Sequence, residues 1–274
     1  MKHVGKSYDK VDAKGILSGK PSYTGDFVPK GALIIKVLRS PHAQARIKSI
    51  DTSKAKLIPG VEAIFTYEDV PNTRFTLAGQ TYPEPSAYDA LILDPVVRYV
   101  GDEVALVVAK DEATALKAMP LIKVEYEVQK PVLDLRTAMD HETVVHPEDD
   151  ILNHIPVGQD YKRNICVSYH KRVGDIEGEL AKCDYVIEGT YFDQATRQSA
   201  MEPFQSFGYI DHLGRIVIVS STQIVFHVRR HIARALGIPA SKIRVIKPRI
   251  GGGFGSKQTA CTELMTAFVT WKLQ

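Results

Sequence analysis

The chain has 274 residues, of which 44% are hydrophobic and 24% are charged, a composition that is ordinary for a globular protein. Its net charge of +3 is too small to indicate nucleic-acid binding, and no apolar run approaches the roughly 18 residues that a membrane span needs. The cysteines Cys166, Cys183 and Cys261 lie far apart without a C-x-x-C pair, so they indicate neither a zinc nor an iron–sulfur site. Such sparse cysteines, together with an N-terminus that lacks an apolar leader, predict a protein of the reducing cytoplasm.

The clearest local unit spans residues 97–130. A continuous apolar run at 104–109 predicts a buried strand. Asp111 is a good N-cap for a helix over 112–119, which Pro120 ends, and a second strand is expected to follow it. This order of elements predicts a β-α-β unit.

The rest of the chain alternates polar loops with shorter periodic segments. Residues 72–90 are interpreted as an irregular surface excursion that is long enough to contact a partner, and residues 131–172 as a connector with scattered, surface histidines. Arg229, Arg230 and Arg234 are expected to form a solvated basic face on a helix. Strands are expected over residues 32–38, 63–66, 121–127, 185–192, 208–211, 215–220 and 243–246, and helices over 175–183, 226–236 and 259–273.

A glycine-rich loop joins the last of these strands to the last helix. It reads Gly251-Gly252-Gly253-Phe254-Gly255-Ser256-Lys257. Glycine lets the backbone adopt φ > 0 and approach a bound group closely, and a loop that enters a helix N-terminus presents unpaired N–H groups. Ser256 stands where the dinucleotide fingerprint needs its third glycine and where a Walker A loop needs glycine before lysine. The loop therefore predicts a cradle for an anion or oxo group that matches neither nucleotide motif, although a tight turn without a ligand stays open.

This loop resembles the G-G-G-F-G-x-K loop of the xanthine dehydrogenase and aldehyde oxidase family, the molybdenum hydroxylases. The similarity covers most of the chain, because other segments fall in the family's order: Arg39-Ser40-Pro41-His42-Ala43, Val97-Arg98-Tyr99-Val100-Gly101, Met201-Glu202-Pro203 and Ser221-Thr222-Gln223. The resemblance implies an α+β fold. It assigns an α/β hammerhead-type domain to residues 1–130, a connector to 131–172, and the first part of a molybdopterin-binding domain to 173–274.

The resemblance also implies roles for individual residues. The residues expected to bind the molybdenum–pterin cofactor are Gln223, Gly252, Gly253, Phe254 and Gly255. Three of these are also expected to act in catalysis beside the metal's oxygen ligands: Gln223, Phe254 and Gly255. No side chain of the chain is expected to ligate a metal directly. A glutamine amide both donates and accepts hydrogen bonds, so it can hold an oxo group without adding a charge.

Three departures from the family pattern limit what can be carried over. Gln258 follows the loop lysine where some xanthine-oxidising members have a glutamate, so it is expected to contact substrate without a charge. Gln198 and Phe204 flank the M-E-P triplet where the family often has histidine, which puts a polar role there in doubt. The family's general base lies in segments that have no counterpart here, so the chain is expected to be inactive without a C-terminal portion or a partner subunit.

The function implied is hydroxylation of an aldehyde or of an N-heterocycle such as a purine, with oxygen from water. Iron–sulfur clusters and FAD are expected on other domains or subunits of an oligomer, with no membrane or nucleic-acid partner. Two alternatives stay open. In the first, the chain is a non-catalytic docking module of such a complex. In the second, it is a protein that binds a nucleotide through residues 251–255.

Overall fold

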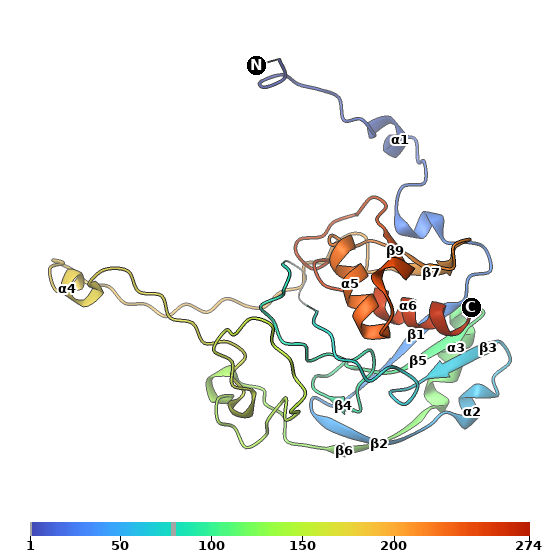
Figure 1. Cartoon of the computed structure of the whole chain (residues 1–274), viewed down its shortest axis with the longest axis horizontal. Helices are drawn as coiled ribbons and strands as arrows, with labels where there is room; N and C mark the ends of the chain where they lie inside the picture. Colours follow the sequence, from blue (N-terminus) through green and yellow to red (C-terminus); the bar gives the residue numbers. More distant parts are fainter. Residues whose placement is uncertain (1, 78–80) are drawn as a thin grey trace.

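The computed structural model describes residues 2–77 and 81–274, which form three three-stranded sheets with the orders β1-β5-β3, β4-β2-β6 and β7-β8-β9 (Figure 1). The strands are β1 Ile34–Arg39, β2 Ala45–Asp51, β3 Val61–Phe65, β4 Val96–Val97, β5 Glu103–Ala109, β6 Lys123–Val128, β7 Ser206–Ile210, β8 Ile216–Ser220 and β9 Ile243–Ile246. The α-helices are α1 Ala13–Leu17, α2 Ser53–Lys56, α3 Glu112–Ala118, α4 Ile176–Leu180, α5 Val225–Leu236 and α6 Glu263–Lys272. Within these described residues, no helix is long and apolar enough to cross a membrane.

Strand β5 is the central strand of the β1-β5-β3 sheet, and it is buried as its continuous apolar run predicts. It pairs antiparallel with β1 on one side and β3 on the other, and Val104 to Ala109 are fully buried. Successive side chains of a strand point to opposite faces. Ala105 and Val107 therefore join the cluster around Ala115 of α3, whereas Leu106 and Val108 join the cluster that contains Phe268 of α6. Val104 joins a third cluster with Ala45, Ile47 and Val97, so one strand contributes to three cores.

The predicted β-α-β unit over residues 97–130 is wrong in its pairing, although its strands and helix exist. Asp111 caps α3 by accepting a 2.7 Å hydrogen bond from the backbone N–H of Thr114. However, β6 joins a different sheet from β5 and pairs antiparallel with β2. Lys123, Glu125 and Glu127 of β6 are exposed and alternate with half-buried residues, a pattern that suits a strand with one wet face rather than a parallel strand buried on both faces.

The parallel unit of this chain is instead β8–α5–β9. Strand β8 is buried along its whole length, and β9 runs parallel to it with Ile216 opposite Ile243. Helix α5 connects the two strands and buries Val228, Ile232 and Leu236, as its apolar spacing predicts. It ends at Gly237, whose φ of 65° is the left-handed conformation that favours glycine. This unit brings the chain to the glycine-rich loop.

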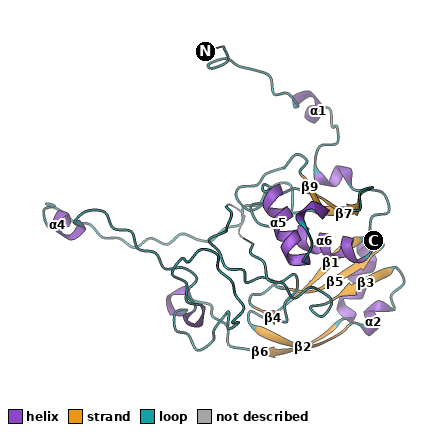
Figure 2. Ribbon diagram, viewed as in Figure 1, coloured by secondary structure: helices purple, strands orange, loops and turns teal. Residues whose placement is uncertain are grey.

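Residues 173–199 leave the body as an extended arm that carries α4 near its tip (Figure 2). Asp175 caps α4 through the backbone N–H of Gly178 at 3.1 Å, as expected from the sequence.

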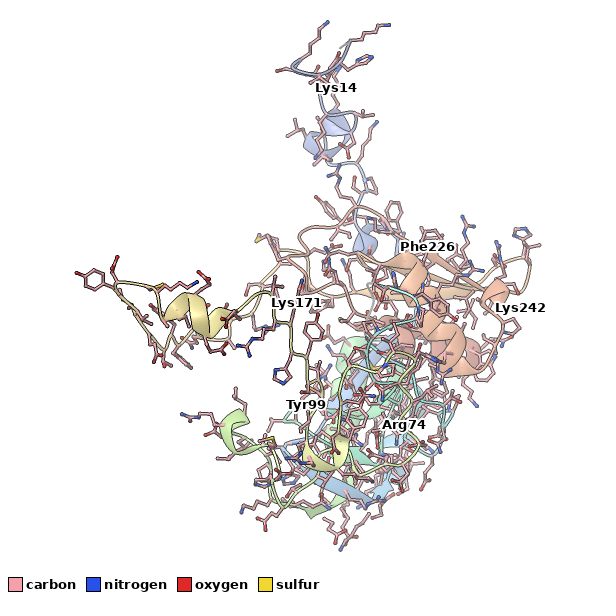
Figure 3. The ribbon with its side chains drawn as sticks, turned by 60° about the vertical axis from the view of Figure 1, so that its left-hand side comes forward. Lys14, Arg74, Tyr99, Lys171, Phe226 and Lys242 are labelled. Carbon is pink, nitrogen blue, oxygen red and sulfur yellow. The ribbon has the colours of Figure 1, made fainter. Side chains whose placement is uncertain are left out.

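The strand predicted over residues 185–192 is wrong: this stretch is coil without a paired neighbour. Its apolar side chains, such as Ile187 and Phe192, are 93% exposed. Strand propensity alone therefore does not form a strand where no sheet edge is adjacent. Figure 3 shows Lys171 where the chain leaves the body toward this arm.

The arginines of α5 are a solvated basic face only in part: Arg234 is exposed and the other two are half-buried, but each donates to a partner within the chain. Arg230 Nη2 donates a 2.7 Å hydrogen bond to the buried carboxylate of Glu84, and Arg234 Nε donates to the Arg74 carbonyl at 2.7 Å. The Arg234 guanidinium also lies over the Tyr88 ring, 4.5 Å from its centroid. The excursion at residues 72–90 thus contacts α5 of its own chain through the part that is described.

The connector, residues 131–172, is attached to the rest of the fold by an ion pair between Glu148 and Arg98. Burial alone would raise the pKa of Glu148, but hydrogen bonding to His146 and the charge of Arg98 lower it to about 2. A carboxyl whose pKa is lowered on folding stabilises the fold above its unfolded pKa, and this contribution disappears as the pH falls through the folded value.

We therefore expect the free energy of unfolding of a Glu148→Gln variant to lie below that of the wild type at neutral pH. The gap should narrow as the pH falls from about 5 toward about 2, because the unfolded carboxyl binds its proton first. Urea denaturation at several pH values measures the gap. Glu62→Gln, on the exposed side of β3, is the control that should leave the pH dependence unchanged. A gap that stays constant with pH would contradict this account of Glu148.

Candidate functional site

The glycine-rich loop follows β9. The sequence predicts a helix directly after this loop, but in the structure the helix begins later. Helix α6 begins at Glu263 rather than at residue 259. The Glu263 carboxylate accepts hydrogen bonds from the N–H groups of Cys261 at 2.8 Å and Thr262 at 3.0 Å, and from Ser220 Oγ at 2.6 Å. Hydrogen bonds to the Glu263 side chain therefore take the place of the first predicted turn of the helix. The glycines do not stand at a helix N-terminus, so the cradle cannot use the unpaired N–H groups that a helix start would present.

The backbone of the loop uses glycine where the chain turns left-handed. Gly252 has a φ of 103° and Gly255 a φ of 84°. Phe254, between them, has a φ of 49°, which is uncommon for a residue with a Cβ. A tight turn holds this conformation, because Ser256 donates to the Gly253 carbonyl from its N–H at 2.8 Å and from its Oγ at 2.7 Å. Backbone strain of this kind is concentrated at functional sites.

Gly253 is glycine for a different reason, the close approach of Gln223. A Cβ at position 253 would lie 2.6 Å from both Cδ and Oε1 of Gln223. Gln223 follows β8, and its N–H donates a 2.9 Å hydrogen bond to the Lys257 carbonyl. The structure thus brings together Gln223 and Gly253, which are far apart in the sequence, as the resemblance implied.

The Gln223 amide is the most informative group of the site. Its Oε1 is buried, and no hydrogen-bond partner for it exists among the described residues. Leaving a buried acceptor unpaired costs roughly 1–3 kcal/mol, so native proteins rarely tolerate it without a reason. An amide oxygen beside Gly253, in a loop whose Gly255 is exposed, fits a ligand with hydrogen-bond donors of its own. The residues present are therefore compatible with the molybdenum–pterin group.

The other expected site residues border the same loop. The Phe254 side chain is 74% exposed, and no heavy atom lies within 4 Å of a Cβ built on Gly255, so both face open space. Gln258 is half-buried, and its N–H donates a 3.2 Å hydrogen bond to the Gly255 carbonyl. Gln198 and Phe204 are exposed, and nothing in the described structure gives them a polar role. Across residues 2–77 and 81–274, no cluster of histidine, cysteine and carboxylate side chains could hold a metal ion.

Sequence reasoning missed a buried ion pair beneath the loop. The Lys257 ammonium lies 3.0 Å from the carboxylate of Glu202, and the two side chains are 2% and 7% exposed. Burial raises the pKa of Glu202, but hydrogen bonds from Gly251, Lys257 and Gln205 outweigh it and lower the pKa overall. The M-E-P and loop motifs contained both residues, but nothing in the sequence indicated that they meet.

Two family models match successive parts of this fold. Residues 18–130 match the "aldehyde oxidase and xanthine dehydrogenase, a/b hammerhead domain", and residues 157–274 match the "molybdopterin cofactor-binding domain". The two matches define a cofactor-binding protein of the molybdopterin class. The chain belongs to the xanthine dehydrogenase and aldehyde oxidase family, the molybdenum hydroxylases.

Individual relatives agree with this family. A probable hypoxanthine oxidase of Escherichia coli K12 is 40% identical over 97% of this chain and 30% of its own length. The nicotinate dehydrogenase large molybdopterin subunit of Eubacterium barkeri is 30% identical over 98% of the chain and 59% of its own length. The crystal structure of quinoline 2-oxidoreductase from Pseudomonas putida 86 superposes with a TM-score of 0.80 at 29% identity, over 98% of this chain and 33% of that one. The chain thus spans between about a third and three fifths of the length of these relatives.

Proposed function

We propose that this chain contributes part of the active site of a molybdenum hydroxylase. The observation that carries the proposal is the buried, unpartnered Oε1 of Gln223 against the glycine-rich loop. In this proposal the molybdenum–pterin cofactor is held by Gln223, Gly252, Gly253, Phe254 and Gly255. When bound, that group supplies the two-electron oxidation and the activation of water.

The chain's own residues orient and shield what binds there. Gln223 would help to hold the group through its amide, which can both donate and accept hydrogen bonds, and the backbone at Gly255 would be open to it, because no atom lies within 4 Å of a Cβ built there. The exposed Phe254 ring is placed to exclude water once a ligand or a further segment covers it. None of these groups can act as a general base, which we assign to residues outside this chain.

The substrate class proposed is an N-heterocycle, with aldehydes as the second choice. Three relatives are named for hypoxanthine, nicotinate and quinoline, and each of these compounds contains a ring nitrogen. Gln258 suits such a ring, because an uncharged amide can pair with a ring nitrogen or a carbonyl as donor or acceptor. Which heterocycle binds depends on pocket residues outside the chain.

The remaining assignments follow from the same proposal. Residues 1–130 form the hammerhead-type domain, 131–172 the connector and 173–274 the first part of the cofactor-binding domain. Electrons leave through iron–sulfur clusters and FAD on other domains or subunits of a cytoplasmic oligomer. The 274 residues alone retain neither molybdenum nor pterin and show no turnover, because one amide and one loop enclose too little of a large anionic cofactor.

The structure gives no support to a nucleotide site at this loop. A phosphate-binding loop needs a lysine that can reach the ligand, whereas the Lys257 ammonium is buried against Glu202. The loop is also separated from the N-terminus of α6. The docking-module alternative predicts that loss of the Gln223 amide leaves turnover unchanged.

The experiment replaces Gln223 with alanine in the complete complex. We expect kcat to fall about tenfold, the effect of losing one hydrogen bond of average strength, with little change in KM. Steady-state kinetics and metal analysis of the same preparation provide the measurement. Gln129→Ala, at an exposed glutamine beyond β6, is the matched control. Turnover equal to that of the wild type would contradict the shared active site and favour the docking module.

A further inference from the structure

We propose that Glu202 and Lys257 form a positioning device, here called the loop clamp, that fixes both ends of the glycine-rich loop. Its relevance to catalysis rests on the proposed function, but its effect on the loop itself does not. Neither residue touches the open face of the loop, so both are positioning residues rather than catalytic ones.

A single carboxylate holds the two ends of the loop. Oε2 of Glu202 accepts a hydrogen bond from the Gly251 N–H at 2.8 Å, where the loop begins, and from the Lys257 ammonium at 3.0 Å, where it ends. Oε1 of Glu202 accepts a third bond from Nε2 of Gln205 at 3.0 Å. Gln205 leads directly into β7, so the carboxylate is itself held by the edge of a sheet.

The main chain tightens the same junction. The Glu202 N–H donates to the Gly251 carbonyl at 3.0 Å, which complements the bond from Gly251 to the Glu202 carboxylate. A Cβ at position 251 would lie 2.6 Å from the Glu202 Cβ, so glycine is required for this approach. The Lys257 carbonyl accepts the Gln223 N–H at 2.9 Å. The clamp therefore sets the position of the unpartnered amide together with that of the loop.

Stability is a weak explanation for this pair. Both side chains are nearly fully buried, and the desolvation of two buried charges offsets much of their attraction, so apolar residues of similar volume often stabilise a fold as well or better. What charged, hydrogen-bonded groups add is geometry, because they interact only in a defined arrangement. Gly252, Gly253 and Gly255 lie between the two anchored ends, and glycine has the largest conformational freedom. The turn that Ser256 closes orders the loop internally, but its placement against Gln223 depends on the anchored ends.

The test separates positioning from stability by comparing single and double variants. Glu202→Gln and Lys257→Met each leave a buried partner charge uncompensated, whereas the double variant removes both charges. We expect the single variants to lower Tm and to speed amide hydrogen exchange at residues 251–257 about tenfold or more. In the double variant Tm should recover, because no unpaired charge is buried, while exchange in the loop stays fast.

Kinetics of the complete complex provide the second measurement. The double variant should keep a kcat about tenfold below that of the wild type with an almost unchanged KM, because the loop is present but no longer fixed. Arg215→Met is the matched control, since it breaks the pair with Asp211 at the β7–β8 turn, away from the loop. It should change neither loop exchange nor kcat.

Two outcomes are decisive and independent of each other. If amide hydrogen exchange at residues 251–257 of the double variant equals that of the wild type, the loop clamp is contradicted, whatever the value of kcat. A wild-type complex without molybdenum and pterin would instead overturn the proposed function, and exchange measured on the chain would still decide the clamp.

Discussion

Replacing Gly253 with valine is expected to lower kcat/KM of the assembled enzyme about 100-fold or more. A Cβ at this position meets Gln223 at 2.6 Å, so the loop or the amide must move. Gly253 is not among the glycines with positive φ, and the effect therefore comes from the collision alone. A displacement of about 1 Å at a catalytic site is enough for a loss of this size. Steady-state kinetics of the assembled complex give the value.

Two companions make this result specific. Gly253→Ala places the same first atom without valine's branches, so its loss should be smaller but in the same direction. Gly15→Val, in α1, introduces a side chain whose Cβ has only one ordinary contact, to Lys20 at 3.8 Å, and should leave the kinetics unchanged. Full activity of the Gly253→Val complex would mean that the loop and Gln223 do not form a shared site.

Replacing Phe268 with alanine is expected to lower the free energy of unfolding by about 3–5 kcal/mol, the usual effect of removing a buried phenylalanine ring. The side chain is fully buried in α6, and its ring meets that of Phe65 edge-to-face with centroids 5.1 Å apart. The loss combines the transfer of the ring with the cavity it leaves. Chemical denaturation followed by fluorescence and by circular dichroism measures it.

Phe226→Ala is the matched control, because that ring is 72% exposed at the start of α5 (Figure 3). Its effect should stay within about 0.5 kcal/mol. A small effect of Phe268→Ala would contradict the assignment of α6 to the cluster that also contains Leu106 and Val108.

Where local chemistry decides structure, the sequence is sufficient. The apolar run of β5, the Asp111 cap of α3 and the Gly237 end of α5 are each determined by neighbouring residues, and each prediction is confirmed. The family is likewise recognisable, because its motifs are short, specific and in order. The roles assigned to Gln223, Gly252, Gly253, Phe254, Gly255 and Gln258 stay predictions.

Where distant partners decide structure, the sequence is not sufficient. The sheet that β6 joins depends on which strand edge is free, and the start of α6 depends on how the Glu263 side chain binds neighbouring N–H groups. Arg230 and Arg234 of α5 bind a segment that precedes them by more than a hundred residues. Glu202 and Lys257 meet only because β8–α5–β9 folds back, so their ion pair could not be read from either motif.

The two faces of β5 bear on how this family can be recombined. The hammerhead match ends at residue 130 and the cofactor-domain match begins at residue 157, yet Leu106 and Val108 lie in one cluster with Phe268. A chimera that exchanges only the first segment between relatives would therefore put foreign side chains against α6. Substitutions on that face of β5 must be accommodated by the helix more than a hundred positions later, so the two segments are expected to be inherited as one block.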